Sequence, residues 1–323
     1  MRAAGGPDVL EIADVPAPRP GDNELLVRVV AAGLSGADLV QRRGRYPPPP
    51  GVPADLLGLE YAGEVAQLGD GARRFRIGDR VMGIVGGAGQ AEFVVTHEDL
   101  AMPVPAEVSD LDAGGIPEAW ITAHDALFAQ GRLANGDAVL VHAVGSGVGT
   151  AAAQLAKTHG HFVVGTSRSA WKLERAMPLG VDVGVDAREG KFSDAVLEAT
   201  QQRGAGVILD FVGAAFFDEN IRALAPRGRL VFLSTLGGAD AALSIRSMMR
   251  NRLTLVATTL RPRSAREKAE ATRSFADYAL PLFESGELKV PVDKVFKLEE
   301  AAAAHRYLEE GKAFGKVVFL IAE

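Results

Sequence analysis

Two patterns of hydrophobic and polar positions divide the chain. In the first third, short runs of alternating apolar and polar residues are separated by segments rich in Gly, Pro, Asp and Asn. Alternation of this kind predicts β-strands joined by turns, and the close spacing of the runs predicts a partly open barrel. The runs cover 9–15, 24–33, 61–69, 79–85 and 91–98.

From about Pro117 onward, longer helical segments alternate with short apolar strands. Repetition of strand and helix is typical of a doubly wound parallel sheet, so we predict an α/β fold. Helices are expected over 117–131, 266–286 and 298–313, before a last strand at 316–322 that returns to the first domain. The apolar strands between them fall near 138–142, 161–165, 207–211, 229–233 and 253–259.

Composition narrows the class of protein. The length of 323 residues and the hydrophobic content of 47% allow a large core in roughly two domains. A net charge of −6, with no block of like charges, argues against binding to nucleic acid or to anionic membranes. The chain has no cysteine and no continuous apolar stretch of about 18 residues, so we expect a cytoplasmic protein without disulfides or Cys-rich zinc sites.

The run AVLVHAVGSGVG at 138–149 carries the clearest chemical signal, because an apolar strand ends directly in glycines and a helical segment follows. Glycine lets a pyrophosphate approach the main chain, and the helix N-terminus supplies N–H groups and partial positive charge. We therefore predict a dinucleotide site, although an ordinary tight turn is the alternative and the spacing departs from G-x-G-x-x-G. The predicted contacts are Gly145, Ser146, Gly147, Val148 and Gly149.

The end of the next strand predicts which dinucleotide binds. An NAD site usually places an acidic residue there, about 20 residues after the glycines, and this chain has none. Ser167, Arg168 and Ser169, with Lys172 one turn later, instead offer hydroxyl groups and two cations, which suit the 2′-phosphate of NADP(H). The alternative is that both cations are solvated charges at a helix start.

Several strings together resemble a known family. They include GLSGADLVQRRGRYPPPPG, LGLEYAGEV, IPEAWITAHDAL, GDAVLVHAVGSGVGTAAAQLAK and the closing AHRYLEEGKAFGKVVF. Over nearly its whole length the chain resembles the zinc-independent medium-chain dehydrogenase/reductases of the zeta-crystallin-like quinone oxidoreductase family, with its stress-inducible subgroup nearest. The resemblance implies a GroES-like domain at 1–118, an NADP(H)-binding Rossmann domain at 119–258 and a C-terminal segment at 259–323 that rejoins the first domain.

The resemblance also bears on zinc. Where zinc-dependent relatives carry a cysteine ligand this chain has Ser35, and where they carry the histidine of a Gly-His-Glu string it has Leu59. Two ligands are therefore missing, and we expect no metal. Each of the six histidines, at 97, 124, 142, 159, 161 and 305, is interpreted as structural or surface-exposed.

Without zinc, the resemblance implies direct hydride transfer from NADPH to a quinone or an activated enone. Tyr46, on a stiff proline loop, is the first candidate for a substrate or nicotinamide contact, with loop packing as its alternative. Thr122 matches a threonine near the nicotinamide, with packing inside its helix as the alternative, and Ser35 replaces an asparagine at the pocket. Further cofactor contacts implied by the resemblance are Phe211, Val212, Gly213, Ser234, Thr235, Leu260, Arg261 and Lys316, the last of which could instead be a solvated strand end.

One departure from the family pattern and one unusual helix position remain without a predicted role. Ala187 stands where relatives have a tyrosine over the adenine, and Pro178 lies where a helix starting near Ser169 should kink or end.

Two other functions stay open. An enoyl-thioester reductase of a polyketide or fatty-acid pathway shares the fold, and Arg42, Arg43 and Arg45 could form a basic entrance for a carrier arm. A non-catalytic NADPH-sensing or RNA-binding protein is the third hypothesis, which the acidic balance disfavours. A homodimer is expected, because the apolar strand at 253–259 should lie at an uncovered sheet edge.

Overall fold

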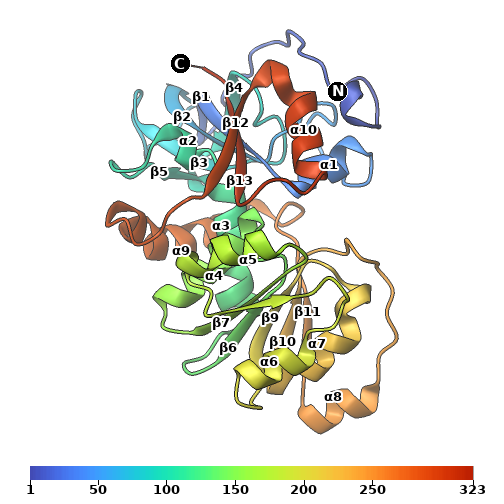
Figure 1. The fold of residues 1–323 in the computed structure, drawn as a ribbon. Coiled ribbons are helices and arrows are strands. Elements are labelled where there is room, and N and C mark those ends of the chain that lie inside the picture. Colours follow the sequence, from blue (N-terminus) through green and yellow to red (C-terminus); the bar gives the residue numbers. More distant parts are fainter. Residues whose placement is uncertain (323) are drawn as a thin grey trace. The chain divides into compact units, whose positions relative to one another are not determined.

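The computed structural model describes residues 1–322, and the chain forms two units, each built around its own sheet (Figure 1). Unit 1 comprises Met1–Ile121 together with the chain from Leu260 onward, and unit 2 comprises Thr122–Thr259. Unit 1 is therefore discontinuous in sequence, whereas unit 2 is a single stretch.

Strand β1 (Glu24–Leu34) is the centre of the unit 1 sheet, whose order is β12-β13-β1-β2-β3-β5. One edge of β1 pairs with β2, and the other pairs first with β4 at residues 24–28 and then with β13 at residues 31–34. The other strands are β2 (Glu60–Leu68), β3 (Arg80–Ile84), β4 (Phe93–His97), β5 (Ala101–Pro103), β12 (Val292–Lys297) and β13 (Lys316–Leu320).

The alternation seen in the sequence fixes which face of β1 is buried. Leu25, Val27 and Val29 are fully buried and pack with Tyr61 of β2 and Val81 of β3. The strand predicted at 9–15 is wrong: after a short helical turn at Pro7–Val9 this segment has no regular structure. Its alternating apolar residues have no partner strand, and Ile12 is 54% exposed.

The helices of unit 1 begin at recognisable caps. Ser35 caps α1 (Gly36–Arg42), and Ser264 caps the long helix α9 (Ala265–Glu284) through a capping box with Glu267. The other helices are α2 (Asp110–Ala113), α10 (Ala301–Glu309) and α3 (Pro117–His124), which continues beyond the unit boundary into one wide helical turn at Asp125–Gln130.

The sheet of unit 2 is parallel throughout, in the order β11-β10-β9-β6-β7-β8. This confirms the predicted α/β class with a doubly wound sheet. The strands are β6 (Ala138–Val141), β7 (Phe162–Ser167), β8 (Val183–Asp186), β9 (Ala205–Asp210), β10 (Leu224–Phe232) and β11 (Thr254–Ala257).

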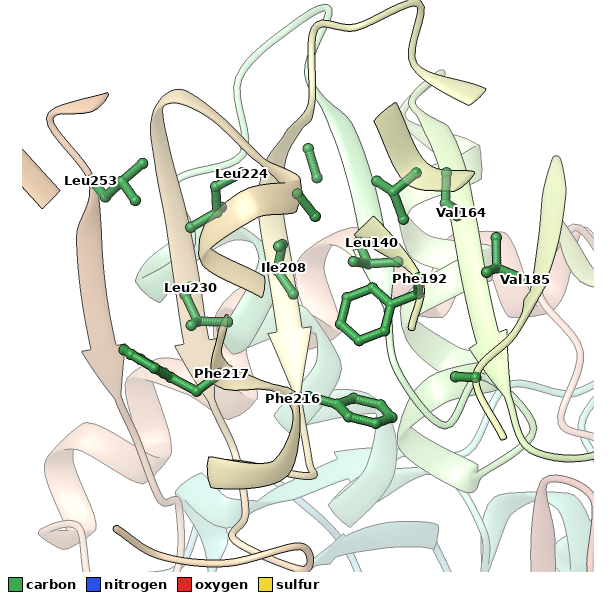
Figure 2. Packing of buried hydrophobic residues seen from close by; sticks show 14 residues of the cluster. Leu140, Val164, Val185, Phe192, Ile208, Phe216, Phe217, Leu224, Leu230 and Leu253 are labelled. Atoms are coloured by element: carbon green, nitrogen blue, oxygen red, sulfur yellow. The ribbon is translucent and has the colours of Figure 1, made fainter. Parts of the chain in front are cut away.

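One face of this sheet carries the core in Figure 2, where Leu140, Val164, Ile208 and Leu230 project from four neighbouring strands. Side chains from the covering segments, including Phe192 and Phe216, close over them. The buried Ala187 belongs to the same cluster, so this departure fills core space. The helices of unit 2 are α4 (Gly147–Thr158), α5 (Ala170–Ala176), α6 (Ser193–Ala199), α7 (Phe217–Ala223) and α8 (Ile245–Asn251).

Pro178 ends a helix, as its position predicts. Helix α5 stops at Ala176, and Met177–Leu179 forms a tighter turn that closes on Gly180 in the left-handed conformation. The edge position of β11 also matches the prediction for the strand at 253–259. No helix within residues 1–322 combines the length and the apolar character needed to cross a membrane.

Candidate active site

The glycine turn of unit 2 connects the end of β6 to the start of α4. Ser146 caps the helix, and its Oγ accepts a hydrogen bond from the Gly149 N–H at 3.1 Å. The left-handed residue of the turn is Ala143 (φ 45°), so the left-handed conformation expected of the glycines falls on an alanine. Gly149 is needed for close packing instead, because a Cβ there would lie 2.5 Å from the Ala143 carbonyl oxygen.

The first turn of α4 leaves N–H groups available for an anion. The N–H groups of Gly149 and Thr150 are taken by Ser146. Gly147 and Val148 begin the helix, so their N–H groups have no intrahelical acceptor. Helix N-termini in this state bind phosphates well, and the residues present therefore fit a pyrophosphate.

Residues at the end of β7 lie where the sequence predicted the 2′-phosphate site. Ser167 is buried, and its Oγ accepts the Ser169 N–H at 3.1 Å. Arg168 is exposed, whereas Lys172 is half-buried with its ammonium 5.2 Å from the centre of the Trp171 ring. The two cations thus stand at the start of α5, next to the strand end.

A buried polar network that the sequence analysis missed joins three strand ends. His142 follows β6 directly, and its two ring nitrogens lie 2.8 Å from Thr166 Oγ1 and 2.7 Å from Asn220 Oδ1. Asn220 in turn donates to Asp210 at 3.0 Å. Because the Asn220 amide nitrogen is used on Asp210, its oxygen accepts from His142 Nε2, which leaves Nδ1 to accept the Thr166 hydroxyl hydrogen.

The two titratable members of this network differ in charge near pH 7, because His142 is neutral whereas Asp210 is mostly ionised. Burial lowers the pKa of His142 to about 4, so the imidazole is neutral near pH 7. Burial raises the pKa of Asp210 to about 6, although the N–H groups of Gly213 and Val212 donate to its carboxylate and oppose that rise. The network therefore serves to hold the chain at the end of β9.

The segment after β9 forms a small platform with the segment after β10. The N–H groups of Leu236 and Gly237 donate to the carbonyls of Phe211 and Val212, and the Ala214 N–H donates to Gly238. Gly213 adopts φ 82°, and a Cβ on it would lie 2.6 Å from the Gly238 carbonyl oxygen. Of the other predicted contacts in unit 2, Ser234 and Thr122 are half-buried and Thr235 is exposed.

The glycine turn and this platform follow adjacent strands of the sheet. β6 lies between β7 and β9, and the chain runs outward from it in one direction before returning to fill the other side. In open parallel sheets this switch point, at the carboxyl ends of the strands, is where ligands bind. Unit 2 thus brings together the predicted phosphate contacts and the predicted nicotinamide contacts Phe211 and Gly213 at the carboxyl-terminal ends of its strands.

In unit 1 the proline loop is fixed by Arg261. The guanidinium donates to the Tyr46 carbonyl at 3.0 Å, to the Gly86 carbonyl at 2.6 Å and to Gln41 Oε1 at 2.8 Å. It also lies 4.9 Å from the centre of the Tyr46 ring. Arg261 is 6% exposed, so its fork is fully engaged in positioning the loop.

Ser35 is likewise occupied locally. Its N–H and hydroxyl group both donate to Asp38, at 2.8 and 3.1 Å, and the Gly58 N–H donates to the other carboxylate oxygen of Asp38 at 3.1 Å. Burial raises the pKa of Asp38, against the effect of these donors. Ser35 therefore ties the start of α1 to the loop before β2.

Lys316 is buried and not a solvated strand end. It is 3% exposed, and its Nζ lies 2.5 Å from Glu60 Oε1. Burial alone would lower its pKa, but Glu60 and Glu118 outweigh that effect and raise it. Glu60 also accepts the Glu118 N–H at 2.9 Å, which fixes the start of α3 against β2.

A small cavity of about 30 Å³ opens beside this charged cluster, within unit 1. Apolar side chains form much of its wall, and the polar lining comes from Glu118, Arg261 and Lys268. Leu260 is half-buried and also lines it. A larger surface hollow of about 460 Å³ lies along α9, between His97 and Arg273, and none of the predicted site residues lines it.

Sequence reasoning missed Asp38, Glu60 and Glu118 as members of this cluster. The signal was present for Glu118, because a charged residue interrupts the apolar string IPEAWITA. For Asp38 and Glu60 the signal was weaker, because acidic residues at helix starts and in strands are common on surfaces.

The arginines considered for a basic entrance are largely engaged. Arg42 is 1% exposed and forms an ion pair with Glu309, and Arg43 binds the same carboxylate at 2.6 Å. Arg42 also lies 3.1 Å from His305 Nδ1. Arg43 is nevertheless exposed, and Arg45 is also exposed at the loop.

Comparison with known proteins agrees with this architecture. Residues 21–106 match the alcohol dehydrogenase GroES-like domain family, and residues 147–276 match the zinc-binding dehydrogenase family. The predicted combination of a GroES-like domain with a Rossmann domain is thereby confirmed.

Relatives that match nearly the whole chain carry oxidoreductase and synthase names. The chain is 32% identical to a quinone oxidoreductase of Pseudomonas aeruginosa, over 98% of this chain and 97% of that protein. It is also 32% identical to part of a phenolphthiocerol/phthiocerol polyketide synthase of Mycobacterium tuberculosis, covering 98% of this chain but 14% of that much longer protein.

Two solved structures bear on the cofactor. A mycobacterial protein in complex with NADPH is 30% identical, with a TM-score of 0.88 and coverage of 99% of this chain and 98% of that chain. An NAD-dependent alcohol dehydrogenase is 34% identical, with a TM-score of 0.88 and coverage of 100% and 98%. Both nicotinamide dinucleotides are therefore represented among close structural neighbours.

Proposed function

The chain belongs to the medium-chain dehydrogenase/reductase superfamily, in its quinone oxidoreductase-like family, and on that basis we propose that it reduces quinones or activated enones with NADPH. The observation that carries this proposal is the carboxyl-terminal end of the unit 2 sheet, where a helix start with two available N–H groups, two cations and a glycine platform follow neighbouring strands. The likeness to full-length quinone oxidoreductases supports the acceptor class.

NADPH would be held by three groups of residues. The N–H groups of Gly147 and Val148 would bind the pyrophosphate, and Arg168 with Lys172 would bind the 2′-phosphate. The platform at Phe211 and Gly213 would support the nicotinamide half. When bound, the reduced nicotinamide supplies hydride to the acceptor.

The protein's own contribution would be orientation and a hydrogen bond to the acceptor oxygen. Tyr46 is held by Arg261 on a loop stiffened by four consecutive prolines, and its phenol is half-buried. Burial raises the pKa of that phenol, so it stays protonated and can donate to an oxygen that gains negative charge. Thr122 stays a candidate contact on the nicotinamide side.

The assay that tests this function measures initial rates of NADPH and NADH oxidation against ortho-quinones, para-quinones, enals and crotonyl thioesters. NADPH-dependent turnover of quinones or enals, with little from thioesters, is the expected result. A preference for thioesters would instead favour the enoyl reductase hypothesis, which the similarity to a polyketide synthase segment supports. Tight NADPH binding without turnover would favour a sensing protein.

We also propose that the protein is a cytoplasmic homodimer. β11 lies at the edge of the unit 2 sheet and, within residues 1–322, pairs with β10 on one side only. Its outer edge can therefore pair with a strand of a second copy of the chain. Nearby in sequence, Leu236, Ile245 and Met249 are 75%, 68% and 73% exposed, which is more apolar exposure than an isolated surface segment usually shows. Sedimentation of the wild-type protein beside a Val256→Lys variant tests this expectation, because Val256 lies on β11 outside the core cluster that Leu255 packs against.

A further inference from the structure

Glu118 is the one member of the charged cluster in unit 1 whose carboxyl group has no partner of its own. Its N–H donates to Glu60, but no hydrogen bond or ion pair reaches its side chain from any residue between 1 and 322. The side chain is half-buried and instead lines the cavity of about 30 Å³. A cavity of that size has room for one or two water molecules.

The neighbouring charges are already committed to other groups. Glu60 is paired with Lys316, and Asp38 accepts three hydrogen bonds from Ser35 and Gly58. Arg261, the other cation whose charge acts on Glu118, gives its hydrogen bonds to Gly86, Tyr46 and Gln41, none of which is charged. Of the three carboxyl groups in the cluster, Glu60 is therefore paired with a cation, Asp38 is held by neutral donors, and Glu118 has neither among the described residues.

Burial and the charges of the surrounding residues together determine the pKa of Glu118. Burial and the charges of Glu60 and Asp38 favour the protonated form, whereas Lys316 and Arg261 favour the carboxylate. Lys268 of α9 also lines the cavity, and burial lowers its pKa. The balance places the pKa of Glu118 at about 7.

We propose that Glu118 is the proton donor of the reduction, delivering a proton from the cavity to the oxygen of the acceptor after hydride transfer. This inference rests on the proposed function. It assigns different tasks to two residues, because Tyr46 would orient the oxygen by a hydrogen bond while Glu118 would lose and regain a proton.

The proton and electron balance is simple. A quinone that accepts hydride from the reduced nicotinamide becomes a hydroquinone monoanion, and an enone becomes an enolate. The O–H bond of the Glu118 carboxyl breaks and a new O–H bond forms on that anion, which leaves oxidised cofactor, neutral product and a Glu118 carboxylate. The carboxylate then takes a proton from solvent through the cavity.

Electrostatic coupling between the two residues supports this division of tasks. The Glu118 charge raises the pKa of the Tyr46 phenol, after burial as the first cause, so the two side chains lie within range of each other. A phenol whose pKa is raised above 10 releases no proton near pH 7. A carboxyl group that is half protonated there can both release and recover one.

The test compares wild-type enzyme with Glu118→Gln, which keeps the side-chain volume but cannot release a proton. We expect wild-type kcat to fall about tenfold per pH unit above the pKa of Glu118, and the variant to be roughly 30-fold slower at pH 6.5 and independent of pH between 6 and 8.5. In Glu118→Asp, kcat should still fall as the pH rises, because aspartate can also release a proton. NADPH affinity, measured by fluorescence, should change less than about twofold.

Glu64→Gln provides the matched control, because Glu64 lies on β2 in a half-exposed ion pair with Arg28. Its rate and pH profile should equal those of the wild type. A Glu118→Gln enzyme that keeps the wild-type rate and the wild-type limb above pH 7 would overturn the assignment, whereas an inactive wild type with every acceptor would overturn the proposed function instead.

A second experiment measures the protonation of Glu118 without catalytic turnover. Because folding raises the pKa of Glu118, the native state binds the extra proton and the wild type loses stability as pH rises from about 5 to about 8. The Tm of Glu118→Gln relative to wild type should therefore increase over that range. A constant difference would show that Glu118 does not hold a proton near neutral pH.

Discussion

The guanidinium of Arg261 lies 4.9 Å from the centre of the Tyr46 ring and donates to the carbonyl of the same residue at 3.0 Å. Two contacts of different kinds thus hold one residue, the first through its side chain and the second through its main chain. Because Arg261 also binds Gly86, the proline loop is connected to the end of β3. Tyr46 is therefore placed by a residue 215 positions later in the sequence.

Replacing Arg261 by Lys should release this loop. Lysine keeps the charge but cannot reproduce the planar fork, so at least one buried acceptor among Tyr46, Gly86 and Gln41 loses its donor. We expect a loss of about 2–4 kcal/mol of unfolding free energy and a raised KM for the acceptor, measured by urea titration and steady-state kinetics. Arg266→Lys, in an exposed ion pair with Glu270, should change neither.

Replacing Arg168 and Lys172 together by Ala should weaken NADPH much more than NADH. Two charge-assisted contacts to a phosphate correspond to roughly a 10- to 100-fold increase in the KM for NADPH. Arg175→Ala is the control, because Arg175 also lies on α5 and contacts the Trp171 ring, at 5.8 Å. Equal losses for both dinucleotides would remove the 2′-phosphate assignment.

Gly213→Ala should strain the platform at the end of β9. Any Cβ at this residue meets the Gly238 carbonyl oxygen at 2.6 Å, and the positive φ adds a further cost for alanine. We expect a loss of about 1–3 kcal/mol in stability together with weaker binding of either dinucleotide, since the nicotinamide half is common to both. Gly190→Ala provides a comparison, because Gly190 has φ 68° but nothing within 4 Å of its Cβ position.

The His142 network should make the free energy of unfolding depend on pH in the acidic range. Folding lowers the pKa of His142 to about 4, so the unfolded chain binds more protons between about pH 4 and 6.5. The contribution of His142 to stability is therefore fully present above pH 6.5 and is lost as pH falls toward 4. NMR of the ring nitrogens should show a neutral imidazole protonated on Nε2 down to pH 5, and an imidazolium signal at pH 6 would contradict the hydrogen-bond assignment.

The sequence predicted the parts of the fold that depend on local patterns. The apolar strands of unit 2 and the glycine turn follow from period and composition, and the parallel sheet follows from their alternation with helices. The segment at 9–15 shows the limit of that reasoning, because alternation is necessary for a strand but a partner is also required. Strand β12 was missed for the complementary reason, since its pairing with β13 is not visible in its own pattern.

The candidate site likewise has one part that the sequence predicted and one part that it did not. The phosphate contacts could be predicted because they lie close together in sequence, on one turn and one strand end. The charged cluster could not, because Asp38, Glu60, Glu118, Arg261 and Lys316 are brought together by strand register and helix placement. Tyr46 and Arg261 were each predicted, but no pattern in the chain indicates that one holds the other.

The discontinuity of unit 1 has a consequence for the order in which a newly synthesised chain can fold. Residues 122–259 contain every strand of the parallel sheet and leave the ribosome while the edge of β1 at residues 31–34 still lacks β13. Unit 1 is thus the first to begin synthesis but the last to be complete, which is opposite to the usual order in which the N-terminal domain folds first. Until β13 is translated, half of one edge of the central strand β1 is exposed, and chaperone binding during synthesis should be concentrated there.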